Sequence, residues 1–310
     1  MSYAEFMTSQ VVPYLDSRRV TCGVTTRDGK NLHCEKYAAD DPRGTVFIVH
    51  GFTENAVKYS EAIYRFLTAS FSVLIYEQRG HGRSWRALDD VTLTHVDRFE
   101  SYTEDLEDVV SSAKDMPKPF FLFAHSMGGA VGAQYLETGS TVFSKAILTS
   151  PMIAPARGGV PLFAAKAICR AAFALGKKEK RIFNSQPYPG KESFADACST
   201  DEEKFTYYEA IKRKNELFHN YSPTYGWLFE SLVITSKLLA KGKPENIAVP
   251  VLVISAQLDT VVLTDEQKKF ADRLKNGSFA VIEGAKHEIY LSTPDVADPY
   301  FERVISFFRG

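Results

Sequence analysis

Residues 120–129 read F-F-L-F-A-H-S-M-G-G, and this stretch decides the fold that we expect for the whole chain. The unbroken apolar run 120–123 is typical of a strand that is buried on both faces of a parallel sheet. A helix over residues 130–136 is predicted to follow at once. Ser126 would then stand on a sharp turn between a strand and a helix, with its hydroxyl exposed at the top of the sheet.

A turn of this kind is the nucleophile elbow of serine hydrolases. The turn is crowded, so the residues two before and two after the serine must be small, and here they are Ala124 and Gly128. Free N–H groups at the start of the helix also favour negative charge that develops during acyl transfer. The alternative is that Ser126 only caps the helix. The other parts of a serine hydrolase therefore have to be located in the chain.

The composition limits the class of protein. A chain of 310 residues with 45% hydrophobic residues can form one large domain, or one domain with an insertion. A formal net charge of −1 argues against a nucleic-acid binder, which would carry a basic excess. No apolar stretch suits a membrane span, and the N-terminus lacks the basic and apolar segments of a signal peptide.

The cysteines and histidines show no spacing typical of a metal site. Cys22, Cys34, Cys169 and Cys198 are far apart, and none forms C-x-x-C. Free thiols in a reducing compartment are the prediction, with pairing of Cys22 and Cys34 across a hairpin as the alternative. We therefore expect a cytoplasmic protein that uses no metal and no cofactor.

Strand and helix patterns alternate along most of the chain. Strands are predicted for residues 19–26 and 32–37, which flank the hairpin signal D-G, and for 45–50, 71–76, 145–150, 251–256 and 279–283. Helices are predicted for 57–67, 99–114, 264–274 and 295–308, and an irregular arm with a short helix for 1–18. This alternation indicates an α/β fold whose mostly parallel sheet is covered by helices on both faces.

The alternation stops between residues 154 and 246, where the pattern is helical and its entry is rich in proline and glycine. This stretch is far longer than an ordinary connection in such a fold. We interpret it as a helical cap inserted over the strand ends. The predicted organisation is a first core segment 1–153, a cap 154–246 and a second core segment 247–310.

A serine nucleophile needs an acid and a histidine, and in this kind of sheet they follow the serine in that order. Of the seven histidines, only His287 lies beyond the last predicted strand. Asp259 follows the strand 251–256 and is in place to accept a hydrogen bond from His287 and fix its tautomer. Asp265 is the rival acid, but it falls in the first turn of the next helix, where acids are common.

Two backbone donors near Ser126 would form the oxyanion hole. One is the N–H of Met127, which follows the nucleophile. The other is the N–H of Phe52, in the loop H-G-F after the strand 45–50. Gly51 allows the backbone to come close, and His50 is expected to brace the loop rather than to transfer protons.

Five motifs together resemble the α/β-hydrolase superfamily: H-G-F-T-E-N, Y-E-Q-R-G-H-G-R-S, A-H-S-M-G-G, Q-L-D-T-V-V and G-A-K-H-E. The nearest branch is the bacterial lysophospholipases and monoacylglycerol lipase-like hydrolases, whose cap is also similar to residues 220–228. The resemblance covers roughly residues 15–308. The chain differs from the usual family residues at Ala124, where glycine is usual, and at Glu77, where many relatives carry aspartate.

The resemblance implies a serine esterase that cleaves lipid esters through an acyl-enzyme on Ser126. A small-molecule carboxylesterase, an iminopeptidase-like hydrolase and a non-catalytic binding protein on the same fold stay open as alternatives. Proline iminopeptidases typically carry H-G-G-P-G where this chain has H-G-F-T-E. A dehalogenase would need an acid in place of Ser126.

The cap offers candidates for substrate and membrane contact. Its aromatic residues, Tyr225 and Trp227 among them, are candidates to line an apolar path to Ser126. Residues 160–175 form an apolar helix pattern, and the basic cluster Lys177, Lys178, Lys180 and Arg181 follows it. This combination is typical of peripheral contact with a membrane surface, and equally of an ordinary helix end. A peripheral location at the inner membrane surface is therefore one hypothesis.

Overall fold

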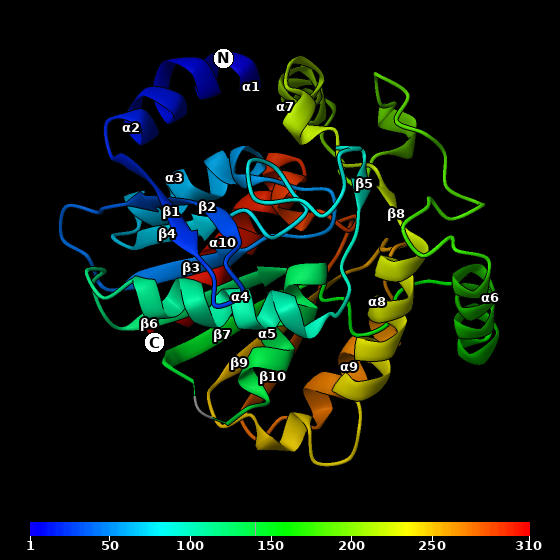
Figure 1. Ribbon diagram of the computed structural model, residues 1–310. Coiled ribbons are helices and arrows are strands. Elements are labelled where there is room, and N and C mark those ends of the chain that lie inside the picture. The colour runs from blue at the N-terminus through cyan, green and yellow to red at the C-terminus, as the bar shows by residue number, and fades with distance from the viewer. Residues whose placement is uncertain (140) are drawn as a thin grey trace.

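The computed structural model describes residues 1–139 and 141–310, and its centre is one sheet (Figure 1). The strand order is β1-β2-β4-β3-β6-β7-β9-β10. The strands are β1 Arg19–Thr25, β2 Asn31–Tyr37, β3 Thr45–Val49, β4 Ser72–Tyr76, β6 Phe120–His125, β7 Phe143–Thr149, β9 Val251–Ala256 and β10 Gly277–Ile282. Only the pairs β1–β2 and β2–β4 are antiparallel, so the prediction of a mostly parallel sheet is confirmed.

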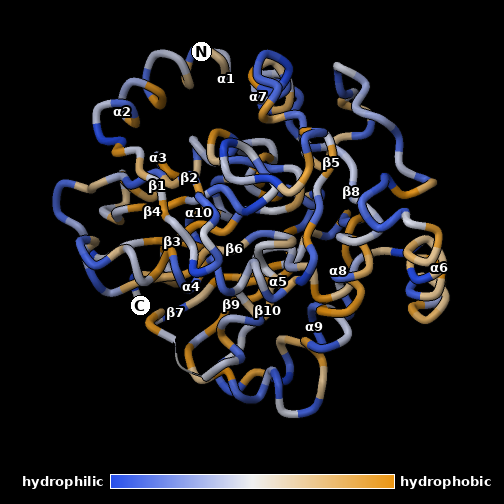
Figure 2. Tube along the Cα trace, in the orientation of Figure 1, coloured by the Kyte–Doolittle hydropathy of each residue, from blue (hydrophilic) through white to orange (hydrophobic). Residues whose placement is uncertain are grey.

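Helices cover both faces of the sheet because its inner strands are apolar on both faces. In β3, Val46 and Ile48 pack into one core with α3 Ser60–Thr68 and α10 Pro294–Arg309. Phe47 and Val49 point the other way, toward α4 Glu100–Ser112, α5 Met127–Leu136 and α9 Thr264–Asp272. Figure 2 shows the strands as largely hydrophobic and the outer loops as largely hydrophilic. The result is a layered α/β core.

The N-terminal segment was predicted as an irregular arm with a short helix; a helix is present, but the segment is helical throughout residues 3–16, so the irregular part of the prediction is wrong there. Helix α1 Tyr3–Phe6, a π-helical turn Met7–Val11 and α2 Val12–Asp16 follow one another directly. Met7, Val11 and Leu15 are at most 4% exposed. Their spacing of four residues places them on one face of a helix, and burial of that face explains the order.

Residues 154–246 contain three long helices: α6 Leu162–Ala174, α7 Glu202–Lys214 and α8 Tyr225–Leu238. The described chain adds no strand to the eight-stranded sheet here. In Figure 1, α6 and α8 lie side by side and α7 lies beside α1. A short parallel ribbon, β5 Leu93–Thr94 with β8 Ser222–Pro223, ties this region to the core and was not predicted. The boundaries of a separate cap stay a prediction.

The four cysteines are free thiols. Cys22 and Cys34 are opposite one another in the β1–β2 hairpin, but they are not joined, so the alternative of a disulfide there is not realised. Among the helices described, none has the length and apolar character needed to cross a membrane.

Candidate active site

Ser126 occupies the turn between β6 and α5 with φ 53° and ψ −117°, in a region that non-glycine residues rarely adopt. Backbone bonds hold this strained turn: Ser126 N–H donates to Thr149 O at 3.1 Å, and Ser126 O accepts from Met152 N–H at 2.8 Å. A Cβ at Gly128 would lie 2.1 Å from Val49 O, so only glycine fits there. The Ser126 side chain makes no capping bond. The alternative of a simple helix cap is therefore not supported.

The structure brings Ser126, His287 and Asp259 into one hydrogen-bonded series. His287 Nε2 lies 2.8 Å from Ser126 Oγ, and His287 Nδ1 lies 2.7 Å from Asp259 Oδ2. A carboxylate can only accept, so Nδ1 carries the proton that it donates to Asp259. Nε2 is then free to accept from the hydroxyl of Ser126. This is the tautomer that a general base toward serine requires.

Asp259 is held by the loop that follows β9. Its other oxygen, Oδ1, accepts from Val261 N–H at 2.8 Å and Val262 N–H at 3.0 Å. Burial favours the neutral acid, but the bond to His287 and these backbone donors outweigh burial and hold the pKa of Asp259 below its ordinary value. Asp259 is therefore ionised at neutral pH and suited to orient an imidazole.

The other two acids near this sequence region lie elsewhere. Asp265 is exposed in the first turn of α9. Glu288 Oε1 accepts from Lys58 Nζ at 2.5 Å instead of reaching back to the neighbouring imidazole. Only Asp259 of the three acids contacts His287.

The predicted oxyanion donors lie on two segments that meet at Ser126. Met127 is the first residue of α5, and Phe52 lies in the loop after β3. A Cβ on Gly51 would come within 3.1 Å of Ser126 Cβ, so glycine permits this close approach. In the described structure neither the Phe52 nor the Met127 N–H donates to a protein acceptor. Both remain available for a bound oxygen.

His50 braces the oxyanion loop, as expected. It is completely buried, which lowers the pKa of its imidazole. Nε2 accepts from Gln78 N–H at 2.9 Å, so the proton sits on Nδ1 and is donated to Gly51 O at 2.8 Å. The side-chain amide of Gln78 donates in turn to His50 O. Both ring nitrogens are used for structure.

Glu54 is a feature of the site that the sequence analysis missed. Its buried carboxylate accepts from Gly51 N–H in the oxyanion loop and from the hydroxyls of Tyr59 and Tyr290. Tyr290 follows His287 by three residues, and the imidazole of His125, beside Ser126, lies 3.8 Å from Glu54. One carboxylate thus links three of the four loops that carry the candidate catalytic groups, all but the Asp259 loop after β9. The sequence signal was the glutamate in H-G-F-T-E-N.

The pH dependence of stability should report the charge of Glu54. Burial opposes ionisation, but nearby His125 and Lys58 and the two tyrosine hydroxyls outweigh it and lower the pKa of Glu54 to about 2. A depressed carboxyl pKa adds stability that is present above the unfolded pKa and is lost as the pH falls through the folded one. Glu54→Gln removes a buried carboxylate from its partners, a change that typically costs about 3 kcal/mol or more, and it should therefore be less stable than the wild type at neutral pH.

This difference in unfolding free energy should shrink as the pH falls from about 4.5 toward 2, where the wild type loses the charge. Urea unfolding at a series of pH values measures it. Glu216→Gln, at an exposed glutamate, is the control and should match the wild type throughout. If the unfolding free energy of Glu54→Gln stays below that of the wild type by the same amount at every pH, Glu54 is not the ionised carboxylate that we assign.

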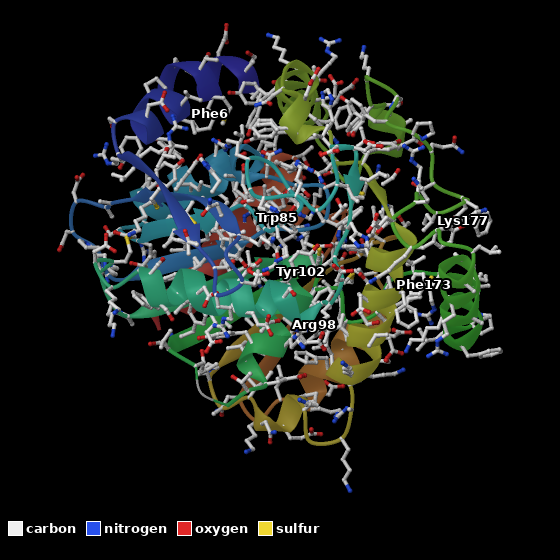
Figure 3. All side chains as sticks on the ribbon, in the orientation of Figure 1. Phe6, Trp85, Arg98, Tyr102, Phe173 and Lys177 are labelled. Carbon is white, nitrogen blue, oxygen red and sulfur yellow. The ribbon has the colours of Figure 1, made fainter. Side chains whose placement is uncertain are left out.

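The two aromatic candidates from the 154–246 region have different surroundings. Trp227 packs on Phe52, with ring centroids 4.2 Å apart, and so covers the oxyanion loop. Tyr225 lies in the small apolar cluster between α6 and α8 that includes Cys169 and Ala172. Figure 3 shows Phe173 of α6 between these helices, where it contacts Phe229. Of the two candidates, Trp227 is the one that contacts the site.

The residues described include no group of three or more histidine, cysteine, aspartate or glutamate side chains arranged to hold a metal ion.

The side chains of the loop 77–84, which include a histidine and two arginines, make structural contacts. Arg79 makes a two-pronged bond to Asp105, at 2.7 and 2.5 Å, and pairs with Asp28 at 3.0 Å. These contacts give Arg79 a structural role.

Comparison with known proteins assigns the chain to a family. The family model described as serine aminopeptidase, S33, matches residues 40–293. The chain belongs to this S33 family. It is 27% identical to the lysophospholipase L2 of Escherichia coli over 88% of this chain and 83% of that protein. It is also 27% identical to the monoacylglycerol lipase of Mycolicibacterium smegmatis, over 81% of this chain and 83% of the relative.

Among solved structures, this S33 chain is similar to a soluble variant of monoglyceride lipase from Saccharomyces cerevisiae. The TM-score is 0.74 with 19% identity, and the match covers 94% of each chain. The predicted α/β-hydrolase fold is confirmed, as is the resemblance to the lysophospholipase and monoacylglycerol lipase-like branch. The protein is a serine hydrolase, in line with the predicted class of enzyme.

The S33 chain departs from the expected pattern at Glu77, and the structure gives that longer acid a place. Glu77 is fully buried, and it accepts from Ala56 N–H at 3.2 Å and Arg83 N–H at 2.5 Å. It also pairs with the Arg83 guanidinium at 2.9 Å. The side chain therefore joins the loop after β4 to the start of the helical turn before α3.

Proposed function

We propose that this protein hydrolyses lipid esters of the lysophospholipid or monoacylglycerol type, with Ser126 as nucleophile. Ser126 Oγ attacks the ester carbonyl while His287 takes its proton, and the N–H groups of Phe52 and Met127 stabilise the oxyanion. His287 then protonates the leaving alcohol, and an acyl-enzyme remains. Water, deprotonated by His287, releases the fatty acid. The single observation that supports this mechanism is the contact of His287 with both Ser126 and Asp259.

The lipid part of the proposal rests on the relatives and on the surroundings of Ser126. The two relatives described above, each of which matches most of this chain, are named a lysophospholipase and a monoacylglycerol lipase. Trp227 and Phe52 supply an apolar surface next to the oxyanion loop, and apolar walls suit an acyl chain. Two other activities compete with this proposal. One is hydrolysis of small carboxylic esters, and the other is the aminopeptidase activity named in the family description.

A serine-directed fluorophosphonate probe and a hydrolysis profile test the proposal. The profile compares lysophospholipid, monoacylglycerol, p-nitrophenyl acetate and an aminoacyl p-nitroanilide. We expect probe labelling at Ser126 and the highest kcat/KM on a long-chain lipid ester. A preference for acetate or for the anilide would reject the lipid substrate, and absence of labelling would reject the serine mechanism.

We also propose that residues 154–246 form a cap over the strand ends. Trp227 of α8 already lies against the oxyanion loop, and the ribbon β5–β8 fixes this region to the core. Substrate selection would then come from this segment, since residues 1–153 and 247–310 supply all five candidate catalytic groups.

Helix α6 is the proposed point of contact with a membrane. It packs on α8 through Cys169 and Ala172 but leaves large apolar side chains in solvent: Phe163 is 77% exposed, Ile168 43% and Leu175 71%. Figure 2 shows α6 as a largely apolar helix at the edge of the molecule, and Figure 3 shows Lys177 pointing outward at its end. An apolar face beside a basic cluster fits an anionic bilayer surface. We therefore propose that the protein is cytoplasmic and binds peripherally to the surface of the inner membrane.

Binding to liposomes that contain anionic lipid should depend on this basic cluster. Replacing Lys177, Lys178, Lys180 and Arg181 with glutamine should reduce co-sedimentation at least about tenfold, because each such charge contributes about 1 kcal/mol near the surface. High salt should have the same effect on the wild type.

The matched control replaces four exposed lysines elsewhere with glutamine: Lys114, Lys241, Lys268 and Lys275. This control variant loses the same net charge as the cluster variant, and it should keep most of the wild-type binding to liposomes. Equal losses in both variants would show only a general charge effect, and a wild type that fails to sediment at low salt would reject the docking proposal. Neither result would affect the serine mechanism.

A further inference from the structure

A cavity of about 200 Å³ lies beside the triad, between α7 and the loop after β3. Its wall includes Thr53, which follows Phe52, and Glu288, which follows His287. The backbone carbonyl of Cys198 accepts from Glu288 N–H at 2.9 Å. Cys198 lines both this cavity and a neighbouring one that has His287 in its wall. The cavity is therefore close to the reacting groups.

Glu209 of α7 lines this cavity, and one of its carboxylate oxygens is unsatisfied. The residue is only 8% exposed. Its Oε1 is buried and accepts no hydrogen bond from any described residue. An unpaired buried acceptor is costly, and the cost is larger for a charged group. A donor on a bound molecule would therefore be stabilised at this oxygen.

The charges in the wall favour a cation as that donor. The wall holds two lysines, Lys58 and Lys212, and four carboxylates, Glu192, Asp196, Glu209 and Glu288. Lys58 is already paired with Glu288, and Lys212 with Glu192. Since Asp196 is exposed to solvent, Glu209 is the buried carboxylate that is left without a positive partner.

Aromatic rings complete the surroundings of this carboxylate. Phe205, Phe218 and Tyr221 line the same cavity. Arg83 already lies over the ring of Phe218 and Lys212 over that of Tyr221, so among the described contacts Phe205 is the one of these three rings without a cation. The faces of aromatic rings attract cations, and ammonium groups are recognised by such rings together with an anion. The combination is suited to an ethanolamine or choline group, and it offers little to an uncharged glycerol.

We propose that this cavity binds the ammonium end of a lysophospholipid head group, with Glu209 as its counter-ion. The inference rests on the proposed lipid-ester function and specifies the lipids that the site selects. In such a lipid, glycerol and phosphate separate the ammonium from the scissile ester. With an ammonium in this cavity, the ester would lie toward Phe52 and His287, whose sequence neighbours Thr53 and Glu288 are in the cavity wall.

The test compares lipids with the same acyl chain and different head groups. The wild type should prefer lysophosphatidylethanolamine and lysophosphatidylcholine to lysophosphatidylglycerol, which has the phosphate without the ammonium. In Glu209→Gln, the kcat/KM for lysophosphatidylethanolamine relative to that for p-nitrophenyl butyrate should fall about tenfold, the size expected for loss of one desolvated cation contact. Glu216→Gln, the exposed control, should keep the wild-type ratio.

A binding measurement separates this proposal from the catalytic one. Glycerophosphoethanolamine is titrated calorimetrically into Ser126→Ala and into the double variant Ser126→Ala/Glu209→Gln, and the double variant should bind about tenfold more weakly. An unchanged substrate ratio and equal binding by the two variants would overturn the role of Glu209. A wild type that cleaves p-nitrophenyl butyrate but no lipid ester would instead reject the lipid part of the proposed function.

Discussion

Replacement of Ser126 with alanine is expected to lower the turnover of an ester substrate by about 10⁴- to 10⁶-fold, because removal of one member of a catalytic unit disables the unit. The hydroxyl is the atom that His287 Nε2 contacts at 2.8 Å. Alanine retains the Cβ and the backbone, so the fold should persist. The measurement is turnover of p-nitrophenyl butyrate together with fluorophosphonate labelling.

The matched control for this substitution is Ser193→Ala. Ser193 caps a short helical turn through its side chain, whereas the Ser126 side chain makes no capping bond. Circular dichroism and thermal unfolding establish that both variants are folded. If folded Ser126→Ala keeps more than a few per cent of the wild-type activity, another residue is the nucleophile.

The second large effect is expected for Asp259→Asn, which should reduce turnover on the order of 10⁴-fold. An asparagine can offer an N–H where the carboxylate offers only acceptors, and His287 would then carry its proton on Nε2, facing Ser126. That tautomer cannot accept the proton of the serine. The backbone donors of Val261 and Val262 can still bind the amide oxygen, so the loop should keep its shape.

Asp265→Asn is the comparison for this variant, since it makes the same chemical change at an exposed residue on the next helix. It should retain nearly full activity. Both variants are measured on one ester at one pH. Similar, small losses in the two variants would leave Asp259 without the orienting role.

The positions of the candidate triad could be predicted because each residue follows a strand with a strong local pattern. Ser126, Asp259 and His287 come after β6, β9 and β10, which are close neighbours in the sheet. The carboxyl ends of parallel neighbours meet at one edge, so chain order was sufficient to bring the three residues together. Hairpin β1–β2 was predictable for a similar local reason, the turn D-G.

Features that depend on distant partners could not be predicted. Strands β5 and β8 have two residues each, and so they carry no periodic pattern. The role of Glu54 depends on Tyr290, which is 236 residues away. Ala124 fits the elbow as its small size predicts, but the space beside it, which Gly132 provides, was not apparent from the sequence: a Cβ at Gly132 would lie 3.2 Å from Ala124 Cβ. Contacts of this kind follow from the packing of the chain and not from its local sequence.

The 154–246 segment leaves and re-enters the sheet between two strands that are already hydrogen-bonded to each other. Ala146 of β7 is the register partner of Val251 of β9, so the chain returns to the position next to the one that it left. An excursion between adjacent strands can change in length or content without altering the register of the sheet. The fold thus permits the segment that we propose selects the substrate to be exchanged as a module, by recombination in evolution or by grafting in the laboratory, while the candidate catalytic residues stay in place.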